Sequence, residues 1–232
     1  MLDSPSALTV ARSSSFLTGL FLTGLEETAV QAMLSGALVR RISAKDDIIT
    51  GGHRATHLFL VQSGRVRYYH LTKHGEVVLL AFLVPGDVIG LVALLKAQST
   101  YMATAEAASD CKLLAWDHTL IRKLASRHPL LGENALNIAL GYVRAYLERH
   151  VGLVTKTAEE RLAETLLRLS DKAGEVHPDG IEIRATNDEL GALADISPFT
   201  ASRLVSNWAR AGTVSKGRGR LLLHNPEALM ID

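Results

Sequence analysis

Hydrophobic residues change their spacing twice along this chain, from a helical period to short runs and back again. A helical segment is predicted up to about Arg41. From Ile48 to Trp116 the apolar runs are short and separated by glycine, which is typical of strands in a small antiparallel barrel or jelly roll. From about His118 the helical period returns, so the chain is predicted to be α+β. The turns between the strands are expected at Ser63-Gly64, His74-Gly75 and Pro85-Gly86-Asp87.

The longest predicted helix runs from about Pro129 to Thr157 and carries two apolar stripes. One stripe consists of Ala135, Ile138, Tyr142, Tyr146, His150 and Leu153. The other consists of Leu136, Leu140, Val143, Leu147, Val151 and Val154. Because a surface helix of a monomer needs one stripe, two stripes favour two partners: the barrel of the same subunit and the same helix of a second subunit. One wide buried face within a monomer is the alternative. The residues predicted to form the homodimer contact are Ile138, Tyr142, Leu147, Val151 and Val154.

The stretch from Thr186 to Leu223 has the pattern of a helix-turn-helix followed by a β-hairpin. Thr186 and Glu189 are spaced as a capping box at the start of the first helix. Ser197 is expected to cap the second helix, with Pro198 in its first turn. This second helix is the predicted recognition helix, and its core-facing residues are Leu204, Val205 and Trp208.

Positive charge is concentrated in this region, although the whole chain has a formal net charge of only +1. Acidic residues outnumber basic ones over residues 156–196. Between residues 197 and 225 every charged side chain is basic: Arg203, Arg210, Lys216, Arg218 and Arg220. A local excess of this kind suits the phosphates of double-stranded DNA. The residues predicted to contact DNA are Ser197, Pro198, Phe199, Thr200, Ser202, Arg203, Lys216, Arg218 and Arg220.

Length and composition exclude several classes of protein. The 232 residues, 47% of them hydrophobic and 21% charged, suit a globular protein with two domains. The uncharged run over residues 13–25 is too short to span a bilayer, and no basic segment precedes it, so neither a membrane span nor a secretory signal is predicted. The repeated FLTGL sequence at Phe16–Leu25 is interpreted as the entry to a small amphipathic helix. The single cysteine, Cys111, excludes an internal disulfide and favours the cytoplasm.

Three functional segments are expected. Residues 1–128 form an effector or sensor β-barrel domain with an N-terminal helix, and residues 129–157 form a central dimerisation helix. Residues 158–232 form a winged helix-turn-helix domain, in which a helix at Ala158–Ala173 precedes a linker hairpin over residues 174–185.

Four motifs make the chain resemble the Crp/Fnr family of bacterial transcription regulators. They are FLVQSGRVRYY (Phe59–Tyr69), FLVPGDVIG (Phe82–Gly90), ERLAETLLRLS (Glu160–Ser170) and SPFTASRLV (Ser197–Val205), in the order of the family. The resemblance implies a jelly-roll, cyclic-nucleotide-binding-like β-barrel, a long central helix and a C-terminal winged helix-turn-helix. It also implies a homodimer on a palindromic site, with half-sites about one helical turn apart, and a contact with RNA polymerase.

The same resemblance assigns roles on the recognition helix. Arg203 is expected to donate two hydrogen bonds to a guanine edge, because its planar fork fits O6 and N7. Ser202 is expected to contact a base or phosphate, and Thr200 a phosphate. Phe199 stands where the family commonly has Glu, so it is predicted to contact a thymine methyl instead. Asp195 replaces a common turn glycine, and Asp tolerates the left-handed conformation.

The sensor part departs from the cyclic-AMP-binding members. Where those members resemble each other in Gly-Glu and Arg-Ser, this chain has Gly90-Leu91 and Tyr101-Met102, and the adenine-contacting pair is replaced by Tyr146-Leu147. No cyclic nucleotide and no other cofactor are predicted, because a buried phosphate without a cation is costly. One cysteine cannot ligate an iron–sulfur cluster. A haem or a small aromatic ligand remains the alternative effector, in an apolar pocket expected around Leu91, Leu94, Leu95, Tyr101, Met102, Tyr142 and Tyr146.

Two other classes of function fit the sequence less well than DNA binding. A cupin-like metalloenzyme needs a His-x-His pair, whereas His53 and His57 are four residues apart; no catalytic residue and no metal ligand is predicted. A helix-turn-helix that binds protein instead of DNA would use the apolar Pro198 and Phe199. The Ser202-Arg203 pair and the basic hairpin favour DNA.

Overall fold

A computed structural model of the chain describes residues 19–95 and 99–229. The chain divides into two compact units, which meet between Arg144 and Ala145. Helix α4 (Leu130–Thr155) runs through this boundary. None of the described helices is long and apolar enough to cross a membrane. The three functional segments predicted from the sequence, residues 1–128, 129–157 and 158–232, have other boundaries than these two units, and they stay a prediction.

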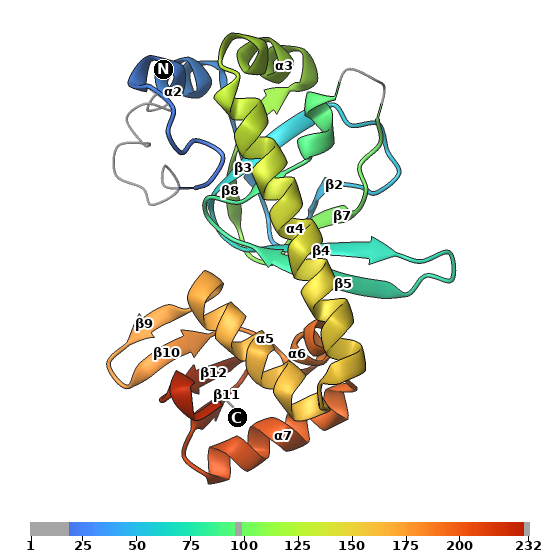
Figure 1. Cartoon of the computed structure of the whole chain (residues 1–232), viewed down its shortest axis with the longest axis vertical. Coiled ribbons are helices and arrows are strands. Elements are labelled where there is room, and N and C mark those ends of the chain that lie inside the picture. The colour runs from blue at the N-terminus through green and yellow to red at the C-terminus, as the bar shows by residue number, and fades with distance from the viewer. Residues whose placement is uncertain (1–18, 96–98, 230–232) are drawn as a thin grey trace. The chain divides into compact units, whose positions relative to one another are not determined.

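The first unit contains two four-stranded antiparallel sheets (Figure 1). One sheet has the order β1-β8-β3-β6, and its strands are β1 (Leu38–Ile42), β8 (Cys111–Asp117), β3 (His57–Ser63) and β6 (Val88–Ile89). The other has the order β2-β7-β4-β5, with strands β2 (Asp47–Ile49), β7 (Thr104–Ala107), β4 (Val66–Leu71) and β5 (Val77–Leu83). The predicted jelly-roll architecture is confirmed, but the two sheets do not close into a barrel.

Strand β3 separates the two parts of this unit's core. Leu58 and Leu60 belong to one buried cluster, and Phe59 and Val61 belong to the other, because successive side chains of a strand point to opposite faces. Burial on both faces of β3 explains why its sequence is a continuous apolar run. The turn after it depends on Gly64, whose φ is +90° and where a Cβ would lie 2.4 Å from the Asp110 carbonyl oxygen.

Besides the N-terminal part of α4, the described helices of the first unit are α2 (Glu27–Gly36) and α3 (His118–Arg127), with a short 3-10 helix η2 (Leu91–Leu94). The helical segment predicted up to Arg41 ends earlier, because residues 38–42 form β1 and pair with β8. The indole Nε1 of Trp116 donates to the Met33 carbonyl at 2.8 Å and ties α2 to β8. Residues 20–24 of the FLTGL repeat form turns, and its part before residue 19 lies outside the described residues.

Helix α4 buries only one of its two stripes, and only in its N-terminal half. Leu131, Ala135 and Ile138 are buried in the core of the first unit, and Tyr142 packs against both of its clusters. Ile138 and Tyr142 thus pack in the core of their own unit, and their assignment to the dimer contact stays a prediction. The exposed residues of the helix include Leu136, Leu140, Val143, Tyr146, Leu147, Val151, Leu153 and Val154.

The second unit is a helical domain with one small sheet (Figure 1). Its helices are α5 (Ala158–Ala173), α6 (Asn187–Ala194), α7 (Pro198–Arg210) and the 3-10 helix η3 (Pro226–Leu229). Its sheet has the order β11-β12-β10-β9, with strands β11 (Val214–Gly217), β12 (Arg220–Leu223), β10 (Gly180–Ile183) and β9 (Glu175–His177). The hairpin predicted as a linker is therefore part of the sheet, because β10 pairs with β12.

Candidate nucleic-acid interface

Helices α6 and α7 form the predicted helix-turn-helix. Thr186 and Glu189 make the expected capping box: the Thr186 hydroxyl accepts from the Glu189 N–H at 3.2 Å, and the Glu189 carboxylate accepts from the Thr186 N–H at 2.9 Å. The Ser197 hydroxyl caps α7 by accepting from the Thr200 N–H at 3.0 Å, and Pro198 is the first residue of the helix. Both helices thus begin at caps whose hydrogen bonds join residues three positions apart in the sequence.

Asp195 forms the turn between the two helices. Its backbone is left-handed, with φ 53° and ψ 47°, so the aspartate does occupy the conformation expected for a turn glycine. The Ile196 N–H closes the turn by donating to the Gly191 carbonyl at 2.9 Å. Gly191 is required there, because a Cβ at this position would lie 2.8 Å from the Ile196 carbonyl oxygen.

Helix α7 has one buried side and one side facing solvent. The predicted core residues Leu204, Val205 and Trp208 are buried, as is Ala201. Arg203 is exposed, and the Phe199 side chain is 80% exposed although it is large and apolar. Ser202 and Thr200 are half-buried beside them. The residues of α7 that are predicted to contact DNA are therefore gathered on the side of the helix that does not contribute to the core.

The wing, β11 with β12, stands next to this helix and is attached to it. The Lys216 ammonium donates to the Ser206 hydroxyl of α7 at 2.9 Å, and the Ser206 hydroxyl in turn donates to the Ser202 carbonyl at 2.6 Å. Arg218 lies at the exposed tip between the strands. In the described part of the chain no hydrogen bond or ion pair joins the Arg218 guanidinium to another residue.

Arg220 differs from Arg218, because an acidic residue from another hairpin neutralises it. Its guanidinium lies 3.2 Å from the carboxylate of Glu182 on β10. Glu182 also lies 3.4 Å from Arg184, which in turn pairs with Glu175 at 3.0 Å. The basic excess over residues 197–225 is thus partly cancelled. Sequence reasoning missed Glu182 because it interpreted the β9–β10 hairpin as a linker.

The seven residues predicted to line an effector pocket do not share one environment. Leu91 and Leu94 pack against the core of the first unit, and Tyr101 is buried. The Tyr101 hydroxyl donates to the carbonyl of His57 at 2.9 Å and accepts from its N–H at 3.0 Å, so it has a structural role. Burial raises the pKa of the Tyr142 phenol, and the nearby Asp87 carboxylate raises it further. The remaining three, Leu95, Met102 and Tyr146, are exposed.

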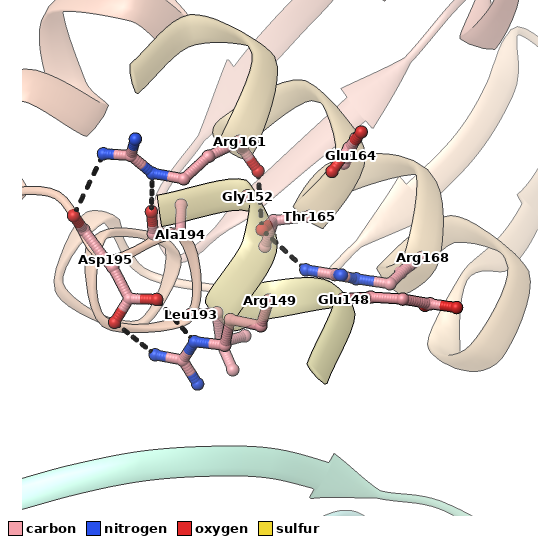
Figure 2. Close-up of a pocket in the computed structure, with 10 residues that line it drawn as sticks. All are labelled: Glu148, Arg149, Gly152, Arg161, Glu164, Thr165, Arg168, Leu193, Ala194 and Asp195. Carbon is pink, nitrogen blue, oxygen red and sulfur yellow. Dashed lines mark hydrogen bonds and ion pairs between the residues drawn. The ribbon is translucent and has the colours of Figure 1, made fainter. Parts of the chain in front are cut away.

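Three further residues around the turn were not singled out by the sequence as site residues. Arg149 of α4 donates to the Asp195 carboxylate, and Arg161 of α5 donates to the carbonyls of Ala194 and Asp195, as the close-up shows (Figure 2). Ser206 was likewise missed as the partner of Lys216. These contacts join residues 10 to 46 positions apart, and no local pattern signals them.

Two protein-family models match the chain in succession. The model of the cyclic nucleotide-binding domain matches residues 39–128, and the model of the Crp-like helix-turn-helix domain matches residues 160–230. The first covers the two sheets, and the second covers the helices and wing described above. The chain belongs to the Crp/Fnr family. Members of this family are transcription regulators and not enzymes, and the Crp-like domain is a DNA-binding domain.

Two curated relatives of this Crp/Fnr regulator match most of the chain. It is 25% identical to the anaerobic regulatory protein of Aggregatibacter actinomycetemcomitans, over 80% of this chain and 72% of the relative. It is 23% identical to the cAMP-activated global transcriptional regulator CRP of Salmonella typhimurium, over 77% of this chain and 86% of the relative. Among solved structures, FixK2 from Bradyrhizobium japonicum has the same fold, with a TM-score of 0.72, 23% identity and coverage of 83% and 95% of the two chains.

Proposed function

We propose that this Crp/Fnr regulator is a cytoplasmic homodimer that binds a palindromic DNA site and does not respond to cyclic nucleotides. In this proposal residues 1–128 sense an effector or serve as a scaffold, residues 129–157 dimerise, and residues 158–232 bind DNA. A contact with RNA polymerase follows from membership of the family.

One observation carries the proposal: the exposed side of α7 presents Arg203 beside a wing that bears Lys216 and Arg218. The guanidinium of Arg203 can donate two parallel hydrogen bonds to a guanine, while the wing residues contact phosphates. Phe199, 80% exposed in the first turn of the helix, supplies an apolar surface for a thymine methyl. Thr200 and Ser202 supply hydroxyls for phosphate or base, and the exposed Ser197 and Pro198 complete the start of the helix.

The exposed stripe of α4 supports the homodimer. Its residues recur every three or four positions, as in the seam between two paired helices. Leu147 and Val151 are 58% and 55% exposed, and Val154 is 80% exposed. An apolar stripe of this length on a surface helix is expected to be covered by a partner, and the same stripe of a second chain is complementary to it by two-fold symmetry.

The lack of a cyclic-nucleotide response rests on two positions. Cyclic-AMP-binding members are expected to have Glu and Arg where this chain has Leu91 and Tyr101. Leu91 opens η2, and Tyr101 is buried, with its hydroxyl bonded to the backbone of His57. Neither side chain can neutralise a phosphate, whose burial without a cation is costly. Titration calorimetry with cyclic AMP and cyclic GMP should therefore show no binding, and micromolar affinity for either would refute this part of the proposal.

The test of DNA recognition is selection from random duplexes. The wild-type protein should enrich a palindrome with two half-sites about one helical turn apart. Arg203→Ala should lose about 1–3 kcal/mol per half-site and relax the base preference at one position. Arg127→Ala, an exposed arginine on α3, is the matched control and should select the wild-type sequence. If Arg203→Ala selected that same sequence with the same stringency, α7 would not be the reading element.

A further inference from the structure

Asp195 makes a second, separate contribution to the turn between α6 and α7. Besides adopting the left-handed backbone, its carboxylate accepts two hydrogen bonds from the Arg149 guanidinium, from Nε at 2.5 Å and from Nη2 at 2.6 Å. A glycine could adopt the same backbone but could not make this ion pair. The Arg149 and Asp195 side chains are only 16% and 29% exposed. A bidentate pair of this kind has a defined geometry as well as a favourable energy.

The same two elements are joined through backbone groups. Arg149 Nη2 also donates to the Ala192 carbonyl at 2.7 Å. Arg161, near the start of α5, donates to the carbonyls of Ala194 and Asp195 at 3.0 and 3.3 Å. The last carbonyls of a helix have no partner within the helix, and cations near them interact favourably with the helix dipole. The two arginines therefore complete the C-terminal end of α6.

These residues line a small cleft between the end of α4, the start of α5 and the turn (Figure 2). The cleft is not a ligand site, because its arginines point inward: Arg149 binds Asp195, Arg161 also binds the Lys156 carbonyl, and Arg168 binds the Thr165 hydroxyl. These polar contacts connect α4 and α5 to the C-terminal end of α6. It belongs entirely to the second unit.

We propose that the Arg149–Asp195 ion pair is a positioning contact that makes the helix-turn-helix a rigid continuation of α4. The proposal rests on the proposed function, in which α4 pairs with its copy and α7 reads DNA. Arg149 lies on the helix of the exposed stripe, two residues after Leu147 and two before Val151. The Arg149 guanidinium binds both the Asp195 carboxylate of the turn and the Ala192 carbonyl of α6, so it transmits the orientation of α4 to α6, and through the turn to α7. The distance and rotation between the two recognition helices, and hence the preferred spacing of half-sites, then depend on this pair.

Two substitutions weaken the Arg149–Asp195 ion pair in different ways. Asp195→Asn keeps a residue that tolerates the left-handed backbone but removes the charge. Arg149→Lys keeps the charge but loses the fork that binds two oxygens at once. The matched control is Arg67→Gln, which breaks a half-buried ion pair with Glu106 in the first unit. Each protein is first compared with wild type by circular dichroism and by its melting temperature.

The measurement is affinity for a series of duplexes that share one pair of half-sites, moved apart or together in single-base-pair steps. Wild type and Arg67→Gln should prefer one spacing. In Asp195→Asn and Arg149→Lys the preference should fall at least about fivefold, the lower range of energetic coupling between sites. The base preference within a half-site should stay unchanged, because Arg203 is not altered.

The possible outcomes separate this inference from the proposed function. If the wild-type protein binds no duplex or shows no spacing preference, the proposed function fails, and the positioning contact fails with it. If the wild type has a preference that both folded variants retain, only the positioning contact is overturned. It is also overturned if the variants change the base preference within a half-site, since the pair would then act on α7 itself. Should Asp195→Asn not fold, Arg149→Lys decides alone.

Discussion

The two wing arginines should contribute unequally to DNA binding, although they stand two residues apart. Arg218 is exposed at the tip of the wing, whereas the Arg220 guanidinium lies 3.2 Å from the Glu182 carboxylate, whose side chain is only 16% exposed. An arginine that already has a carboxylate partner displaces fewer counterions from DNA when it binds. We therefore expect Arg218→Ala to weaken binding to every sequence, and Arg220→Ala to weaken it less.

The magnitude follows from counterion release. Each phosphate contact contributes about 0.9 to the slope of log K against log salt concentration, so the loss of one contact per subunit should make the slope of a dimer shallower by about 1.8. Arg218→Ala should show most of this change. Arg220→Ala should show a clearly smaller one. Glu182→Gln should steepen the slope, because it frees Arg220 and removes a negative charge near the DNA.

The assay is fluorescence anisotropy with a labelled operator duplex, titrated at several salt concentrations between about 50 and 200 mM. A random duplex is measured in parallel, since phosphate contacts should affect both sequences alike. The effect of Glu182→Gln should be smaller in the Arg220→Ala background, and the difference measures the contribution of this pair. Equal slopes for Arg218→Ala and Arg220→Ala, or an unchanged slope for Glu182→Gln, would refute the reasoning.

Three other predictions concern assembly and stability. Leu147→Asp should convert the dimer to a monomer in sedimentation velocity, because it places a charge in the exposed stripe, while Val176→Asp, at a site 96% exposed in the second unit, should leave the dimer intact. Ser197→Ala should lower the free energy of unfolding by about 1 kcal/mol, measured by urea denaturation, because α7 loses its N-terminal cap. Burial lowers the pKa of His57, so the unfolded chain binds a proton there more readily than the folded one; stability should fall as the pH drops below about 6.5, and His57→Gln should reduce that fall.

Local patterns were sufficient wherever the decisive contacts join residues close in sequence. The capping box at Thr186 and the cap at Ser197 are formed over three residues, and the structure confirms both. Helix α5 has the predicted bounds, Ala158–Ala173, and its start is a further capping box, between Thr157 and Glu160. The left-handed turn at Asp195 was also predictable, because it depends on the backbone preference of one residue.

Local patterns failed where pairing with a distant segment decides the structure. Residues 38–41 were expected to continue a helix, but Leu38 pairs with Ala115 and Arg40 with Leu113, so the segment is an edge strand. The β9–β10 hairpin was expected to be a linker, but Ile181 pairs with Leu223 and joins the sheet of the wing. In both cases backbone hydrogen bonds to a strand more than 40 residues away override the local preference.

By itself, the sequence determined the order of elements, the helix caps, the turn of the helix-turn-helix and the identity of the residues that face away from the core of α7. Only the tertiary structure decided which charges remain available: Glu182 partners Arg220, Asp195 partners Arg149, and Lys216 is attached to Ser206. The physical reason is distance along the chain. Caps and turns are local hydrogen bonds with recognisable spacings, whereas an ion pair between separate elements depends on how those elements pack, and a count of charges in one segment contains no record of that packing.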